Sequence, residues 1–171
     1  VIAYSLGDSG LIEEAAGNVM EIDISGSYES RAKWVELLLH SPENEHQKEL
    51  LLSFLADKET MTRKTAFRLA EGLELSDGDY RQIEAFLKYK KGDIRQNVLK
   101  LLEKQSDKGL EESVRRLLSS SSEEMREGGL TLVREARISG RPEAVQKSLA
   151  EEAGKLEGKS DKEQILLEEI T

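Results

Sequence analysis

Apolar residues recur along the chain at the spacing of amphipathic helices. The clearest example stands at i, i+4, i+7 and i+8 and places four side chains on one helix face: Ile94, Val98, Leu101 and Leu102. The same spacing recurs over 110–118, and capping signals such as Ser76 with Asp79 separate such segments. The pattern predicts short amphipathic helices joined by tight loops.

The helical pattern itself repeats about every 32 residues. Four arginines, at separations of 32, 32 and 31 residues, mark the units: Arg31, Arg63, Arg95 and Arg126. The residues four, six and twenty-three positions after each arginine are apolar in every unit: Val35, Phe67, Leu99 and Leu130, then Leu37, Leu69, Leu101 and Leu132, then Phe54, Phe86, Leu118 and Leu149. A constant period of this length predicts stacked units of the same structure.

The predicted fold is all-α, an α-solenoid of about four helix pairs with a flanking helix at each end. The expected elements are a helix at 10–20, an extended stretch from Glu21 to Gly26, helix pairs at 28–57, 60–91, 93–119 and 123–156, and a last helix at 161–170. In domain terms we expect a single array over 1–171, with repeat units at about 28–59, 60–92, 93–122 and 123–158, an N-terminal extension 1–27 and a C-terminal helix 159–171. Ser121 with Glu124 and Ser160 with Glu163 are expected to form capping boxes.

Composition agrees with a helical protein and narrows the functional classes. Charged residues make up 35% and aromatic residues 5% of the 171 positions, with two prolines. The absence of cysteine excludes disulfides, thiolate metal sites and a cysteine nucleophile. No apolar run approaches the roughly 20 residues of a membrane span, so we expect a soluble, cytoplasmic protein. Since the chain begins at Val1 and both ends carry uncovered apolar residues, we expect a piece of a longer protein.

The repeat resembles the HEAT family, in its short class of about thirty residues. The resemblance rests on the arginine near the start of each first helix, the small or apolar residue three positions later (Ala66, Val98) and the apolar residues at the fourth and sixth positions, over 28–156. Trp34 and Gly129 depart from the pattern at the third position. The resemblance implies a superhelical stack whose second helices line a concave face; it is specific for architecture, because members of this family serve as scaffolds, transport receptors, lyase subunits and DNA-repair enzymes.

Several residues could carry chemistry, and for each a structural role is the stronger interpretation. The four register arginines are expected to bond neighbouring repeats. Gly158-Lys159-Ser160 ends like a phosphate-binding loop but has Ala153 where that loop needs glycine. His40 and His46 are spaced too loosely for a zinc site, and adjacent glutamates indicate a solvated helix face. The sequence therefore predicts neither an enzyme nor a cofactor or metal site.

Charge is distributed unevenly along the chain. Residues 1–60 carry 12 acidic and 4 basic residues (net −8), residues 61–118 carry 10 and 13 (net +3), and residues 119–171 carry 12 and 8 (net −4). The resemblance implies that four cations of the basic middle could project onto the concave face: Arg81, Lys88, Arg115 and Arg116. The competing interpretation is a solvated surface of mixed charge, with acids and bases at helical spacing.

These observations favour a non-catalytic interaction module or scaffold, with another protein or the rest of its parent chain as partner. One alternative is binding of a nucleic-acid backbone through the basic strip. The overall isoelectric point near 5.0 and the scarcity of aromatic residues disfavour it. A second alternative is an accessory domain of a larger enzyme. Within the helices, Gly128-Gly129 predicts either the close approach of a neighbouring helix or a frayed helix start.

Overall fold

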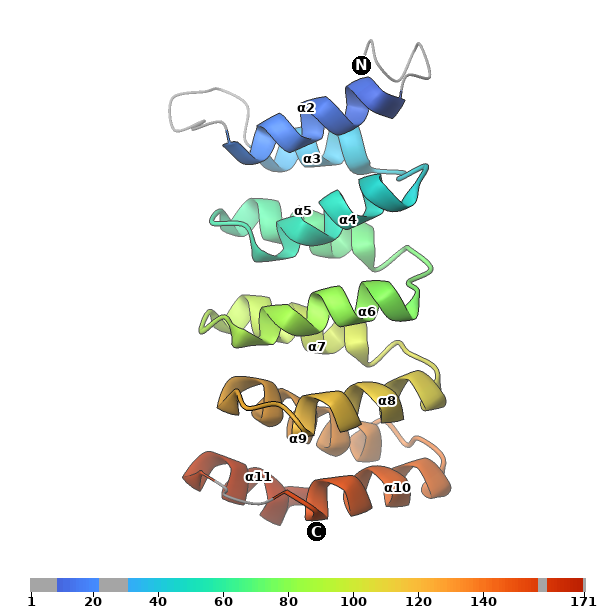
Figure 1. Ribbon diagram of the computed structural model, residues 1–171, viewed down its shortest axis with the longest axis vertical. Helices are drawn as coiled ribbons and strands as arrows, with labels where there is room; N and C mark the ends of the chain where they lie inside the picture. The colour runs from blue at the N-terminus through green and yellow to red at the C-terminus, as the bar shows by residue number, and fades with distance from the viewer. Residues whose placement is uncertain (1–8, 22–30, 157–159, 171) are drawn as a thin grey trace. The chain divides into compact units, whose positions relative to one another are not determined.

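The computed structural model describes residues 9–21, 31–156 and 160–170, and within these ranges the protein is helical and contains no strand (Figure 1). The helices are α2 (Ser9–Glu21), α3 (Arg31–Leu39), α4 (Glu45–Ser53), α5 (Thr60–Ala70), α6 (Asp77–Glu84), α7 (Gly92–Leu102), α8 (Asp107–Leu118), α9 (Glu123–Ile138), α10 (Glu143–Gly154) and α11 (Asp161–Ile170). Two short 3₁₀ segments extend α4 and α6: η1 (Phe54–Ala56) and η2 (Ala85–Lys88). The all-α prediction is confirmed for these residues. The extended stretch expected after Glu21 lies outside them.

The chain divides into two compact units, residues 1–75 and 76–171. In the first unit, α2 packs beside α4 and α3 packs beside α5, while contacts between α2 and α3 and between α4 and α5 join the two layers. The register position Arg31 begins α3, and Arg63 lies in the first turn of α5. The helices predicted at 60–91 are divided between the two units, because α5 belongs to the first and α6 to the second.

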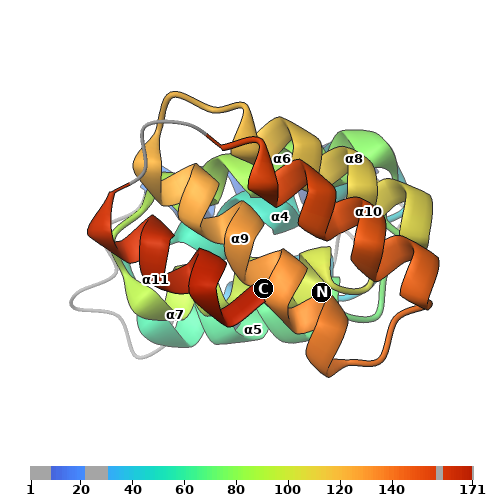
Figure 2. The ribbon, with the colours of Figure 1, turned by 90° about the horizontal axis from the view of Figure 1, so that it is seen from below.

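The second unit repeats the layered arrangement. The helices α6, α8 and α10 lie side by side in one layer, and α7, α9 and α11 lie side by side in the other (Figure 2). Contacts of α8 and α10 with α9 join the layers. Hydrogen bonds from Arg126 to Glu163 and from Arg134 to Glu169 show that α9 and α11 run in the same direction. The neighbours α9 and α11 are therefore parallel.

Aliphatic side chains fill the interior of both units. Leu39, Leu51 and Leu52 are fully buried in the first unit, as Val98 and Leu101 are in the second. Burial of apolar surface at about 25 cal/mol per Å² is the main stabilising contribution of such side chains. The expected core face of α7 is confirmed, since the side chains of this face are at most 1% exposed: Ile94, Val98, Leu101 and Leu102.

Two adjacent glycines allow α9 to lie close to its neighbours. A Cβ atom on Gly129 would stand 3.1 Å from Leu117 Cβ on α8, and one on Gly128 would stand 2.7 Å from Leu87 Cδ1 of η2. Both glycines lie inside α9, not at a frayed start. The close approach of a neighbouring helix is therefore the correct interpretation of this glycine pair.

Two of the three helix caps predicted at serine residues are present in the structure. Ser76 and Asp79 form a capping box at α6, and the Ser160 amide donates to Glu163 Oε2 at 2.7 Å at the start of α11. At α9, however, the N-cap is Ser122, whose hydroxyl donates to Glu124 Oε2. The capping box predicted between Ser121 and Glu124 is wrong, because the helix begins one residue later than that pairing requires.

Candidate partner-binding surface

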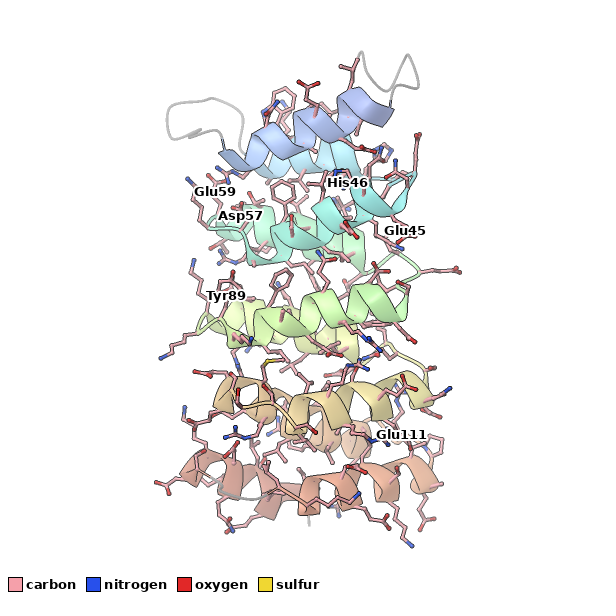
Figure 3. All side chains as sticks on the ribbon, in the orientation of Figure 1. Glu45, His46, Asp57, Glu59, Tyr89 and Glu111 are labelled. Carbon is pink, nitrogen blue, oxygen red and sulfur yellow. The ribbon has the colours of Figure 1, made fainter. Side chains whose placement is uncertain are left out.

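Two of the register arginines, Arg31 and Arg63, converge on a single aspartate in the first unit. Arg31 is 3% exposed, and its Nη1 donates to Asp57 Oδ2 at 3.0 Å. Arg63 donates from Nη1 to the carbonyl oxygens of Asp57 and Lys58, at 2.7 and 3.0 Å. Asp57 is buried in the turn that leads into α5 (Figure 3). Both guanidinium groups therefore bind this turn.

Arg95 links three segments of the second unit. Its Nη1 donates to the carbonyl oxygen of Glu124 at 3.0 Å and to the carbonyl oxygen of Leu87. Its Nη2 lies 3.4 Å from Glu127 Oε2. The residue thus connects the start of α7 to the end of η2 and to the first turn of α9.

Arg126 connects α9 to the preceding loop and to α11. Its Nη1 donates to the carbonyl oxygens of Ser120 and Ser121 at 3.0 and 3.1 Å, and its Nε donates to Glu163 Oε1 at 2.7 Å. Burial raises the pKa of Glu163, but the bonds from Arg126 and from the Ser160 amide outweigh burial and hold that pKa below its usual range. Glu163 is therefore a buried carboxylate kept ionised by the register arginine.

The four cations expected to line a partner-binding strip lie on α6, η2 and α8. Arg81 and Lys88 are exposed, and the Arg115 side chain is 57% exposed. The Nε of Arg115 lies 3.9 Å from Glu152 Oε1 on α10. Arg116 is only partly exposed and bonds inside the unit. Three of the four side chains are thus accessible at the surface of this layer.

Arg116 neutralises a buried carboxylate on α6. Its Nη2 and Nε donate to Glu84 Oε1 and Oε2 at 2.6 and 3.2 Å, and the Ser113 hydroxyl donates to Glu84 Oε1 at 2.7 Å. Glu84 is only 4% exposed. The hydrogen bond to Glu84 raises the pKa of Arg116 above its ordinary value. Because the carboxylate is bound at both oxygens, Arg116 links α8 to α6.

A cavity of about 470 Å³ lies where α8 and α10 end, beside the loop that precedes α9. We call it the α8–α10 cavity; Arg115, Leu118, Ser119, Ser120, Arg126, Glu152, Lys155 and Leu156 line it. Lys155 Nζ donates to Glu152 Oε1 at 2.7 Å, and this bond lowers the pKa of Glu152. The cavity therefore brings one predicted strip residue together with one register arginine.

The remaining candidates of the sequence are ordinary surface or capping groups. His40 and His46 are both exposed, and His46 Nδ1 lies 3.9 Å from Glu49 Oε2. Within the described ranges no group of three or more His, Asp or Glu residues is arranged to hold a metal ion. Ser160 caps α11, and Lys159 lies outside the described residues.

Sequence reasoning did not single out Asp57, Glu84 and Glu163 as partners of the arginines, or Lys155 as a cation of the cavity. Three of these are carboxylates 26, 32 and 37 residues from the arginine that they bind, so no local spacing reveals the pairing. The Ser160 capping signal did mark Glu163, but only as a helix start. The sequence does not distinguish Lys155 from the other surface lysines, and only the fold places it near Arg115 and Arg126.

Over the residues that the structure describes, these observations define an all-helical fold whose helices pack in two layers within each unit and are joined by arginine-centred hydrogen bonds. The chain belongs to a family of unknown function, DUF5724, whose model matches residues 2–171. A search of curated proteins and a search of solved structures each found no match. Among the described residues, no helix has the length and apolar character needed to cross a membrane.

Proposed function

We propose that this chain is a non-catalytic interaction module, an α-solenoid of HEAT-like helix pairs that presents a surface to a protein partner or to the rest of its parent chain. The observation that carries the proposal is a repeated contact. Arg63 and Arg126 each donate from Nη1 to the carbonyl oxygens six and five residues earlier in the chain. The same bond at the same register in both units is typical of a structural repeat.

The packing within each unit supports this architecture. Alternate helices lie side by side in each unit, as in repeat proteins whose units contact mainly their neighbours. Such a scaffold orders its surface during folding, so the binding of a partner costs the scaffold little further conformational entropy. A row of exposed side chains from successive helices can then add many weak contacts.

The surface that best fits this role is the layer of α6, α8 and α10 in the second unit. Arg81, Arg115 and Lys147 are exposed, one on each helix. The mixed charge of the layer, with Glu111 on α8 (Figure 3) and Glu151 on α10, suits the polar rim of a protein interface. We infer that a protein partner contacts this layer.

Site-specific photo-crosslinking tests the proposal. A photoreactive p-benzoylphenylalanine replaces Arg81 or Lys147 in this layer, or Gln96, an exposed residue of α7 in the other layer, and the chain is irradiated in extract of its source cells. We expect one discrete protein adduct, identified by mass spectrometry, from positions 81 and 147 and none from position 96. Adducts of equal yield at all three positions, or no discrete adduct, would contradict a dedicated surface.

One further observation favours binding of a nucleic-acid backbone as a second candidate. Lys88, Tyr89, Lys90 and Lys91 form a continuous exposed segment after α6, and Tyr89 is 48% exposed (Figure 3). Lysines bind phosphates and an exposed aromatic ring can stack on a base. Such binding would weaken steeply with salt, because each neutralised phosphate releases counterions.

Fluorescence anisotropy of labelled single- and double-stranded DNA at low and near-physiological salt tests this candidate. The informative variant is Lys90→Glu/Lys91→Glu, since both side chains are exposed; a change at Arg116 would instead leave Glu84 buried without its cation. Salt-sensitive binding that this variant abolishes supports the candidate. Binding that is absent at low salt, or unchanged in the variant, excludes it for this segment.

A further inference from the structure

The α8–α10 cavity combines hydrogen-bond donors, positive charge and an apolar wall. Arg115, Arg126 and Lys155 contribute the cations, and Leu118 and Leu156 contribute apolar surface. The three cations come from the end of α8, the first turn of α9 and the residue after α10. The fold thus brings together donors that lie as far as 40 residues apart in the chain.

Arg126 is the fixed donor of this cavity. Its Nε and Nη1 are held by Glu163 and by two loop carbonyl oxygens, and its side chain is 17% exposed. Within the described residues, its Nη2 has no hydrogen-bond partner. A guanidinium fixed on one side and open on the other is preorganised to bind an anion from the cavity.

Arg115 and Lys155 are the adaptable donors. Their side chains are 57% and 68% exposed, and both approach the same carboxylate, Glu152. With Glu163 counted behind Arg126, the cluster holds three positive and two negative charges. A single added anion therefore meets a local excess of positive charge.

The chemistry of the donors favours a phosphate monoester over a carboxylate. A phosphate group offers three acceptor oxygens, one for each of the three cationic side chains, and carries a charge of about −1.5 to −2 at neutral pH. A carboxylate offers two oxygens. Leu118 and Leu156 provide contact for an apolar residue beside the phosphate.

Acidic residues near the cavity favour a single phosphate over a nucleic-acid backbone. Glu123 and Glu124 follow the loop that lines the cavity but lie outside its lining, whereas Glu152 lies in its wall. A nucleic-acid backbone would extend beyond the cavity, where Glu123 and Glu124 would repel its further phosphates. One phosphorylated side chain in an otherwise uncharged peptide avoids that repulsion.

We propose that the α8–α10 cavity binds a phosphorylated serine or threonine side chain of a protein partner. The inference rests on the proposed role as a protein-interaction module and names the chemistry of its ligand. The cavity would then make recognition depend on the phosphorylation state of the partner, because the unmodified hydroxyl offers no charge to Arg115, Arg126 and Lys155.

The test uses a small probe that carries only the proposed chemistry, N-acetyl-phosphoserine N-methylamide, titrated into the full ¹⁵N-labelled chain. We expect saturable changes in the backbone amide resonances of Ser119, Ser120 and Arg126. The N-acetyl-glutamate analogue is expected to bind about tenfold more weakly, because it has fewer acceptor oxygens and less charge.

Matched double variants locate the binding. Arg115→Gln/Lys155→Gln is expected to weaken phosphoserine binding at least about tenfold, since it removes two of three cations. Lys104→Gln/Lys108→Gln removes the same charge from two exposed positions of the second unit that do not line the cavity, and is expected to leave the affinity within about twofold. Arg126 is left intact because it also holds Glu163.

Three outcomes would overturn the assignment: no saturable change at the three amides, equal affinity for the glutamate analogue, or equal weakening by the two double variants. If the probe fails to bind while the adduct at position 81 still forms, the cavity assignment falls and the interaction role stands. If the probe binds but no partner adduct forms, the protein-interaction role falls instead.

Discussion

At the scale of single residues, the main surprise is how many arginines serve the interior. Arg31 and Arg63 bind one turn, and Arg116 binds a buried carboxylate. Such groups are costly to bury alone and are stable only with their partners. Some charged residues in this chain are therefore bonded to partners in the interior and others are exposed at the surface, and sequence position alone does not distinguish the two kinds.

Adjacent arginines on α8 provide a direct comparison. We expect Arg116→Leu to destabilise the protein by about 2 kcal/mol, because Glu84 stays buried without its cation. Arg115→Leu, one residue earlier and exposed, should change stability by less than about 0.5 kcal/mol. Urea unfolding monitored by circular dichroism measures both. Equal effects of the two changes would show that the Glu84 bond contributes little.

The apolar core can be tested in the same way at Leu101, which is fully buried on α7. An aspartate there would have to be buried without a partner, at a cost of several kcal/mol. We expect Leu101→Asp to lose helical circular dichroism from the second unit. A variant that stayed soluble and fully helical would contradict the predicted repeat register.

At the scale of elements, the positions of the helices were largely predictable and their contacts were not. The helix predicted at 161–170 coincides with α11, because apolar periodicity and the Ser160 cap act locally. The 3₁₀ endings η1 and η2 carry no such local signal. Nor does the pairing of Arg116 with Glu84, which depends on how α6 and α8 pack.

Alanine substitutions at Gly129 of α9 and at Gly17 of α2 are expected to have opposite effects on stability. Gly129→Ala should destabilise the protein by about 1 kcal/mol net, because its Cβ would press on Leu117 Cβ, an atom fixed to the backbone of α8. Gly17→Ala, inside α2 with no atom within 4 Å of its new Cβ, should stabilise the protein by about 0.5–1 kcal/mol. Thermal unfolding of both variants checks the sign. Stabilisation at both sites would show that α8 and α9 have room to separate.

The attachment of α11 should depend on pH. The folded-state pKa of Glu163 lies below its unfolded value of about 4.3, so its ionised form stabilises the fold above that pH, and the stabilisation is lost as the pH falls through the folded pKa. We expect hydrogen exchange of the α11 amides to accelerate relative to that of α8 as the solution is acidified.

The variant Glu163→Gln separates this effect from general acid unfolding. It should cost about 1–3 kcal/mol at neutral pH and flatten the acid dependence of α11 exchange, since the titrating group is gone. Glu151→Gln removes an exposed carboxylate from α10 and should preserve the dependence. An unchanged pH dependence in Glu163→Gln would exclude Glu163 as its source.

At the scale of the whole chain, the division into two compact units allows unfolding of the second unit to be measured separately from unfolding of the first. The chain has one tryptophan, Trp34, which lies half-buried in the first unit. In Leu101→Asp we expect the Trp34 emission to stay at its native wavelength while the helical signal falls. A simultaneous red shift would show that the units unfold as one cooperative block.

The arginine bonds to loop carbonyl oxygens also determine where the chain can accept extra residues. Arg126 reaches back to Ser120 and Ser121 across a fixed number of peptide groups, so a residue added to 122–125 would shift those acceptors out of reach. The segment 71–75 lies between α5 and α6 and contains the exposed residues Glu71, Gly72 and Glu74. Natural variants that differ in length, and engineered tags or epitopes, should therefore collect in 71–75, while the loops that precede α5 and α9 keep a constant length.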